Sequence, residues 1–169
     1  MSSENPTWYD IKSETMTRDE YFVKFGDKPE IKSTFESYSP KTDVIKEIHD
    51  LLLDQNQSIK ILALGAGWCK DCTTNVPKLV KIVDNLPNER VELRMLYGVK
   101  VNPYRKPGEP IWSKHHSPPE TQDPKFAVTK IPMIYFFDKS GEFLGKIVEN
   151  PKRFSTIEEC ILAFLREKS

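Results

Sequence analysis

Two cysteines, Cys69 and Cys72, are the residues of this chain whose type and spacing are best suited to chemistry. They follow an apolar segment, residues 59–64, that ends in a Gly-Ala-Gly turn, and they precede a segment whose apolar residues recur with helical spacing. The pair is therefore predicted to lie where a strand leads into a helix. Unpaired N–H groups and the helix dipole at that position favour a negative charge, and the thiolate is the reactive form of cysteine. This placement suits a disulfide that forms and breaks reversibly.

A C-x-x-C pair alone is also half of a zinc site. His115 and His116 are the histidines that invite a Cys2His2 set. Adjacent histidines point apart on a strand or in a loop, however, and structural zinc sites space their histidines more widely. We therefore expect no metal site and place both histidines in a solvated loop.

Three further features accompany the cysteine pair. Trp68 precedes the first cysteine, Pro77 follows the second by five positions, and Ile131-Pro132 opens a later apolar run. The combination W-C-x-x-C-x4-P, followed by I-P before a strand, resembles the thioredoxin family over about residues 40–169. Within that family the motif looks like a group of thioredoxin-like proteins that carry a helical N-terminal extension.

The resemblance implies a role for each of these residues. Cys69 would be the nucleophile that attacks a substrate disulfide, and Cys72 would be the resolving thiol that releases the reduced substrate. Pro132 would be cis and lie beside the cysteines, with the backbone of Ile131 pairing with an extended substrate. Trp68 would shield the thiols and complete the substrate-binding surface.

Other residues are expected to tune the motif. Lys70 should favour the Cys69 thiolate by charge attraction, Asp71 should oppose it, and Pro77 should shape the helix that follows. Ala63 is a departure from the family, because thioredoxin itself carries a buried aspartate six residues before its first cysteine. That aspartate helps to move the proton of the resolving thiol, which an alanine cannot do.

The apolar pattern predicts an α/β protein with the thioredoxin fold, in which a four-stranded mixed sheet is flanked by helices. Thr17 opens a capping box with Glu20, and Ser39 is expected to cap the third helix. The predicted helices cover residues 18–25, 29–37, 40–55, 70–85 and 124–129, and a last one starts at about Ser155. The predicted strands cover residues 59–64, 91–97, 133–137 and 142–148.

We expect one compact unit made of two parts. Residues 1–39 would form an N-terminal helical extension packed on the core, and residues 40–169 the thioredoxin-like domain. Residues 98–123 form a long, proline-rich loop insert that leaves the sheet at the edge where the cysteines lie. Trp112 and Tyr104 in this loop suggest a substrate-selecting lid over Cys69.

The charge balance and the apolar content of the sequence limit the classes of partner that the protein can bind. Lys and Arg number 25 and Asp and Glu number 25, which gives no net attraction to nucleic acid or to an anionic membrane. No apolar run approaches the ~20 residues of a membrane helix, and the first residues lack a secretory signal. Three cysteines are too few for a disulfide scaffold. We therefore expect a cytoplasmic protein with neither nucleic acid nor a membrane as partner.

These observations predict a thiol–disulfide oxidoreductase that reduces disulfides of proteins or small molecules and contributes to cell redox homeostasis. It would hold no bound cofactor besides the redox-active Cys69–Cys72 disulfide, and its electrons would come from a reductase or a low-molecular-weight thiol. Two alternatives stay open at this stage. One is a disulfide-forming oxidase, because Lys70 and Asp71 match neither direction of exchange, and the other is a non-enzymatic interaction or metal-binding module.

Overall fold

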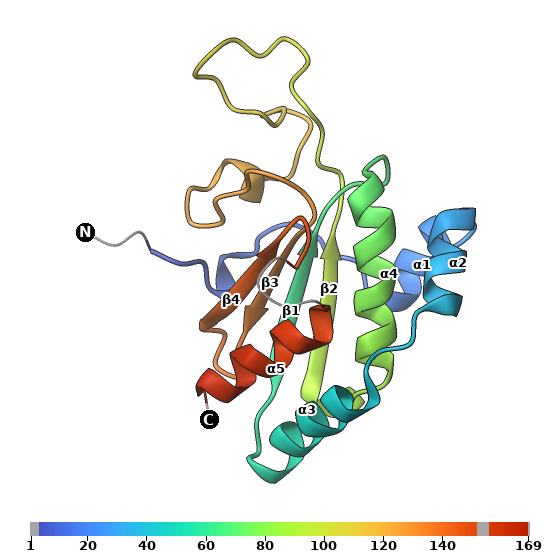
Figure 1. The fold of residues 1–169 in the computed structure, drawn as a ribbon. Helices are drawn as coiled ribbons and strands as arrows, with labels where there is room; N and C mark the ends of the chain where they lie inside the picture. Colours follow the sequence, from blue (N-terminus) through green and yellow to red (C-terminus); the bar gives the residue numbers. More distant parts are fainter. Residues whose placement is uncertain (1–3, 152–155, 169) are drawn as a thin grey trace.

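The computed structural model describes residues 4–151 and 156–168, which contain a four-stranded sheet (Figure 1). The strands are β1 (Ile59–Leu64), β2 (Val91–Leu96), β3 (Met133–Phe137) and β4 (Phe143–Val148), in the order β2-β1-β3-β4. β1 pairs with β2 in parallel and with β3 in antiparallel orientation, and β3 and β4 form an antiparallel hairpin. The sheet is mixed, so the predicted α/β class and strand count are confirmed.

Five α-helices accompany the sheet. They are α1 (Arg18–Phe25), α2 (Pro29–Ser37), α3 (Thr42–Asp54), α4 (Lys70–Asp84) and α5 (Ile157–Lys168). Short 3-10 helices cover Trp8–Asp10, Asn88–Arg90 and Pro119–Gln122. α4 connects the parallel strands β1 and β2, and it packs against α2, while α3 packs against α5. The start of the last helix was predicted at Ser155, which lies outside the described residues.

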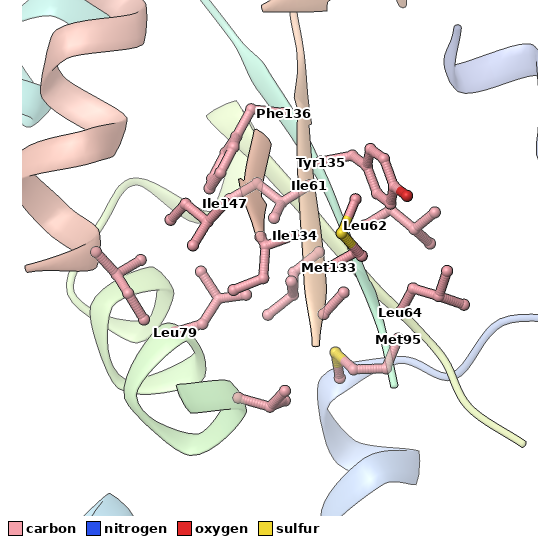
Figure 2. Close-up of a cluster of buried hydrophobic side chains, with 14 of the residues drawn as sticks. Ile61, Leu62, Leu64, Leu79, Met95, Met133, Ile134, Tyr135, Phe136 and Ile147 are labelled. Carbon is pink, nitrogen blue, oxygen red and sulfur yellow. The ribbon is translucent and has the colours of Figure 1, made fainter. Parts of the chain in front are cut away.

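The core lies where β1 and β3 run through the middle of the sheet. Every residue of β3 is buried, and only Lys60 interrupts the burial of β1, which explains why both strands read as nearly continuous apolar runs. Figure 2 shows side chains from these strands meeting Leu79 of α4, Met95 of β2 and Ile147 of β4. This packing fixes the point at which β1 ends and the cysteine segment begins.

Helix capping agrees with the sequence at α1 and differs at α3. The Thr17 side chain accepts the Glu20 N–H at 3.2 Å, and the Glu20 carboxylate accepts the Thr17 N–H at 2.9 Å, so the predicted capping box is confirmed. The prediction of Ser39 as the cap of the third helix was wrong, because α3 starts at Thr42 with Lys41 as its N-cap. The buried carboxylate of Glu158, on α5, accepts the Lys41 N–H at 2.8 Å, a contact that no local pattern signals.

The helix predicted over residues 124–129 is absent, and a single turn stands in its place. Ala127 has a φ of 48°, which is outside the helical region and ends the turn. The carbonyl of the buried Phe126 accepts the Tyr135 hydroxyl at 2.6 Å, so it does not serve a helical N–H group. Tertiary contacts therefore override the local helical preference at this point.

The long loop is anchored at its base. Val101 and Trp112 form a β-bridge, and the Trp112 indole is buried and donates to the Val128 carbonyl at 2.7 Å. Trp112 therefore holds the loop in place and is not available as part of a lid, whereas Tyr104 is 88% exposed. Figure 1 shows the loop extending away from the sheet beyond the start of α4.

The N-terminal segment is joined both to this loop and to the sheet. The carboxylate of Glu120 accepts the Lys12 N–H at 2.7 Å and both the N–H and the hydroxyl of Ser13, at 3.1 and 2.6 Å. Further along, Met16 exchanges two backbone hydrogen bonds with Met95 on the outer edge of β2. The extension is thus hydrogen-bonded to two separate parts of the chain.

Glu120 provides a test of the loop anchor. Burial raises the pKa of its carboxyl group, but the Ser13 hydroxyl and the Lys12 N–H stabilise the carboxylate more, so the net pKa is lowered. A lowered folded-state pKa stabilises the protein above the unfolded-state value of about 4.3, and this stability is lost as the pH falls through the folded-state pKa. We expect Glu120→Gln to lower the unfolding free energy by about 1–3 kcal/mol at pH 7 in urea titrations.

Glu109→Gln is the matched control, because Glu109 lies exposed near the tip of the same loop. It should leave stability at pH 7 within about 0.5 kcal/mol. Equal stability of the Glu120→Gln variant and the wild type at pH 7 would contradict the anchor.

Candidate redox site

Cys69 is the N-cap residue of α4 and the first member of a closely packed thiol pair. Its backbone is extended, with φ −84° and ψ 121°, and its sulfur accepts the Cys72 N–H at 3.2 Å. Both cysteines are free thiols, Cys72 fully buried and Cys69 6% exposed. The pair lies where the sequence places it, at the junction between β1 and the following helix.

The two thiols have opposite acid–base properties. The side chain of Cys72 hydrogen-bonds the Cys69 sulfur and, with the N–H groups of Cys72 and Asp71, lowers the pKa of Cys69 to about 7, although burial and the Asp71 charge oppose the shift. The hydrogen bond to Cys69, together with burial, raises the pKa of Cys72 far above the ordinary thiol value. Cys69 therefore ionises near neutral pH while Cys72 keeps its proton. The opposing effect of Asp71 agrees with the sequence, whereas Lys70 is not among the main causes of the shift.

The segment before β3 reaches the same point from the other side. The Ile131–Pro132 peptide bond is cis, the isomer that the resemblance implies, and both residues are buried. The Cys69 sulfur lies 3.6 Å from the Ile131 carbonyl oxygen. Two chain segments more than sixty positions apart thus meet at the Cys69 sulfur.

Trp68 lies beside the pair with its ring largely in solvent. The side chain is 57% exposed, and its indole N–H donates to the Val99 carbonyl at 2.9 Å, at the start of the long loop. This hydrogen bond fixes the ring orientation without burying it. Pro77 is buried inside α4, and Lys70 is exposed in its first turn.

Sequence reasoning missed the contribution of the extension to this site. Lys28, the residue before α2, donates to the Gly67 carbonyl at 2.6 Å. A Cβ on Gly67 would lie 2.7 Å from the Phe25 ring, so a larger residue cannot take its place unless that ring moves. The Gly-Ala-Gly turn was the available signal, since glycine in such a place marks a close approach between chain segments. The partner segment itself could not be deduced from that signal.

A cleft of about 490 Å³ lies between the extension and the cysteine-bearing segment. Glu20, Lys24 and Phe25 of α1 form one wall, and Gly67 and Trp68 belong to the other. Its lining includes charged side chains of both signs, such as Glu20 and Lys24, and apolar side chains, such as Met95. The exposed indole of Trp68 is part of the same lining.

Neither an acid at position 63 nor the two loop histidines is placed to act on the thiols. Ala63 is fully buried in β1, and its side chain carries no acid. His115 and His116 are exposed in the long loop. Within the described ranges, no group of three or more His, Cys, Asp or Glu side chains is placed to hold a metal ion.

By its fold and by the geometry of this site, the chain is an α/β protein that carries a pair of thiols at a strand–helix junction. Residues 16–97 match the model of a family described as thioredoxin, and the matched range includes the cysteine pair. The four-stranded mixed sheet and this match agree with an α/β thioredoxin-like fold. No curated protein matches it.

Solved structures share the fold at low sequence identity. A protein of unknown function from Pseudomonas aeruginosa is 16% identical with a TM-score of 0.62, covering 91% of this chain and 99% of its own. An HIV epitope-scaffold is 14% identical with a TM-score of 0.69, and the match covers 97% of this chain and 100% of the scaffold. A DsbH oxidoreductase is also 14% identical, over 77% of this chain and 84% of its own, but its TM-score of 0.33 is too low to support an argument. In the part of the chain that the structure describes, no helix is long and apolar enough to cross a membrane.

The coupling between the two thiols can be measured. We expect Cys72→Ala to raise the pKa of Cys69 from about 7 toward the ordinary thiol value of about 8.5, because the variant loses the largest stabilising hydrogen bond. The pH dependence of iodoacetamide alkylation, followed by mass spectrometry, reports this pKa. Cys160→Ala, which removes the distant buried thiol of α5, should leave the midpoint unchanged. A midpoint that stays near 7 in Cys72→Ala would mean that the backbone N–H groups alone lower the pKa.

Proposed function

We propose that this protein is a thiol–disulfide oxidoreductase that reduces disulfides of proteins or small molecules through Cys69 and Cys72. The observation that carries the proposal is the division of roles between the two sulfurs. Cys69 is slightly exposed and has a pKa near 7, while the adjacent Cys72 is buried and protonated. This is the arrangement that thiol–disulfide exchange requires of an attacking and a resolving thiol.

In the proposed reaction, the Cys69 thiolate attacks one sulfur of the substrate disulfide. A Cys69–substrate disulfide forms, the substrate S–S bond breaks, and one half leaves as a thiolate that takes up a proton. Cys72 then loses its proton and attacks the Cys69 sulfur, and the second half leaves in the same way. The substrate gains two electrons and two protons, and the pair becomes a disulfide.

The pKa of Cys69 supports the reducing direction. Thioredoxin has a nucleophile with a pKa of about 7, whereas the strongly oxidising DsbA, whose reduced form is unusually stable, has one of about 3.5. The value of about 7 for Cys69 agrees with the first case. In this proposal, a cytoplasmic reductase or low-molecular-weight thiol would return the pair to the dithiol, and the activity would serve cell redox homeostasis. No bound cofactor takes part.

A redox titration in glutathione and dithiothreitol buffers, read by alkylation and mass, tests the proposal. We expect one two-electron transition below the biochemical glutathione poise of about −220 to −260 mV. Cys72→Ser should form no intramolecular disulfide, and any oxidised form should carry one glutathione on Cys69. A potential near the −120 mV of DsbA would instead indicate a disulfide-forming oxidase. If no disulfide forms, the cysteines are structural and the chain is an interaction or metal-binding module.

Trp68 is proposed to contact the polypeptide of a protein substrate, together with the Ile131 backbone. We expect Trp68→Ala to raise KM for a reducible protein such as insulin by about five- to tenfold, because removing an exposed aromatic contact typically costs about 1 kcal/mol or more. The reaction with a small aromatic disulfide should change less than twofold. Tyr104→Ala is the control, since it removes an exposed ring from the long loop, 88% exposed against 57% for Trp68. Equal losses for both substrates would contradict a docking role.

A further inference from the structure

The resolving step places a demand on Cys72 that the residues described so far do not meet. Its thiol must ionise at the moment of attack, yet burial and the neighbouring sulfur raise its pKa strongly. Ala63, the position on β1 from which a side chain could have assisted, is a buried methyl group. Some other polar group must therefore stabilise the forming thiolate, if the reaction runs at neutral pH.

Tyr21 of α1 carries such a group. It is fully buried, and within residues 4–151 and 156–168 its hydroxyl is the one buried side-chain N or O atom without a hydrogen-bond partner. A buried hydroxyl left unpaired costs free energy, which makes an orphan of this kind unusual in a native core. Its presence is explained if the partner forms only during the reaction.

The surroundings of Tyr21 connect it to Cys72 through Tyr97, the residue that follows β2. A Cβ built on Gly65 would lie 2.8 Å from the Cys72 sulfur and 3.3 Å from the Tyr97 ring, so the sulfur and the ring flank the same point. Tyr21 packs edge-on against Tyr97, with 5.7 Å between ring centroids. The absence of a side chain at Gly65 leaves the Tyr97 ring beside the resolving thiol, and Tyr21 packs against that ring.

Electrostatics agree with this placement. Burial raises the pKa of both tyrosines well above the ordinary value, so both hydroxyls stay neutral hydrogen-bond donors at any pH of interest. The charge of Cys72 acts on each of them and raises each pKa further. The two tyrosine side chains also interact with each other, which lowers the pKa of Tyr21 and raises that of Tyr97, and a neutral O–H donor beside a thiolate stabilises it by hydrogen bonding.

We propose that Tyr21 is a positioning residue for the resolving step: its buried hydroxyl, acting together with that of Tyr97, stabilises the Cys72 thiolate as it attacks the mixed disulfide. This inference rests on the proposed exchange function and deepens it. The Cys72 proton ends on the departing substrate thiolate, the Cys69–Cys72 bond replaces the Cys69–substrate bond, and neither tyrosine changes its own protonation state. The N-terminal extension thereby takes part in the chemistry.

A two-phase reaction separates the steps. The reduced protein attacks dithiobis(nitrobenzoic acid) through Cys69 and releases one coloured thiolate, and resolution by Cys72 releases another. We expect Tyr21→Phe to slow the second release about tenfold or more at pH 7 and to leave the first within about twofold. The difference in second-release rate between Tyr21→Phe and the wild type should shrink as the pH rises. A larger share of Cys72 in the mixed disulfide is then already ionised, so stabilisation of its thiolate matters less.

The charged groups that act on Cys72 are Cys69 and Asp71, and Tyr97 lies beside it. Glu20 and Lys24 line the neighbouring cleft, and Lys28 binds the Gly67 carbonyl. All of these groups are present in both wild type and variant, so the ratio of their rates isolates the effect of the Tyr21 hydroxyl. Because the Tyr21 hydroxyl makes no hydrogen bond of ordinary geometry and interacts only with the Tyr97 side chain, the Tyr21→Phe variant should melt at nearly the same temperature as the wild type. A hydroxyl with a purely structural role would lower the melting temperature when it is removed.

Tyr135→Phe is the matched control for removing a buried hydroxyl. That hydroxyl donates to the Phe126 carbonyl, so the variant should lose stability but keep both release rates. Unchanged second-phase kinetics in Tyr21→Phe would overturn the inference while leaving the proposed function intact, and so would a slowing seen only in Tyr97→Phe. If the wild-type protein releases no second thiolate, the proposed function fails, and this inference fails with it.

Discussion

The geometry of the site depends on how Cys72 contacts the Cys69 sulfur at the first turn of α4, through its N–H at 3.2 Å and through its side chain. The N–H contact requires Cys69 to be extended and Cys72 to be helical, and the chain satisfies both because α4 begins at Lys70, a short turn after β1 ends at Leu64. The parallel pairing of β1 with β2 then brings the end of β2 to the same edge, and the antiparallel pairing with β3 brings Ile131 there. Sheet topology and thiol chemistry are thus consequences of the same arrangement.

The second constraint is the close fit of the N-terminal extension around the cysteine segment. Phe25 lies against Gly67, Lys28 binds its carbonyl, and Tyr21 packs against Tyr97. A thioredoxin-like sheet does not need these contacts to form its hydrogen bonds. Their effect is to hold the loop before Cys69 from one side while Trp68 is held from the other by Val99. Cys69 is therefore positioned by segments both before and after it in the sequence.

The sequence predicted what local patterns control. Apolar runs located all four strands, the capping box located α1, and the joint motif located the thiol pair. The failures share a physical cause, which is that a distant residue decided the outcome. Glu158 moved the start of α3, the contact between Tyr135 and Phe126 replaced the helix at 124–129, and burial of Trp112 removed it from the lid. The roles of Tyr21, Phe25 and Lys28 escaped prediction for the same reason, since each depends on where α1 and the chain after it pack.

The bridge between Met16 and Met95 has a consequence for the behaviour of the protein in concentrated solution. β2 is an outer strand of the sheet, and the unpaired N–H and C=O groups of such a strand can template the addition of another chain. The segment before α1 occupies these groups near the carboxyl end of β2, and α1 then covers the neighbouring surface. The extension thus leaves fewer unpaired backbone groups on β2 for another chain to bind. A chain that lacks the segment before α1 would be expected to aggregate more readily than the intact one.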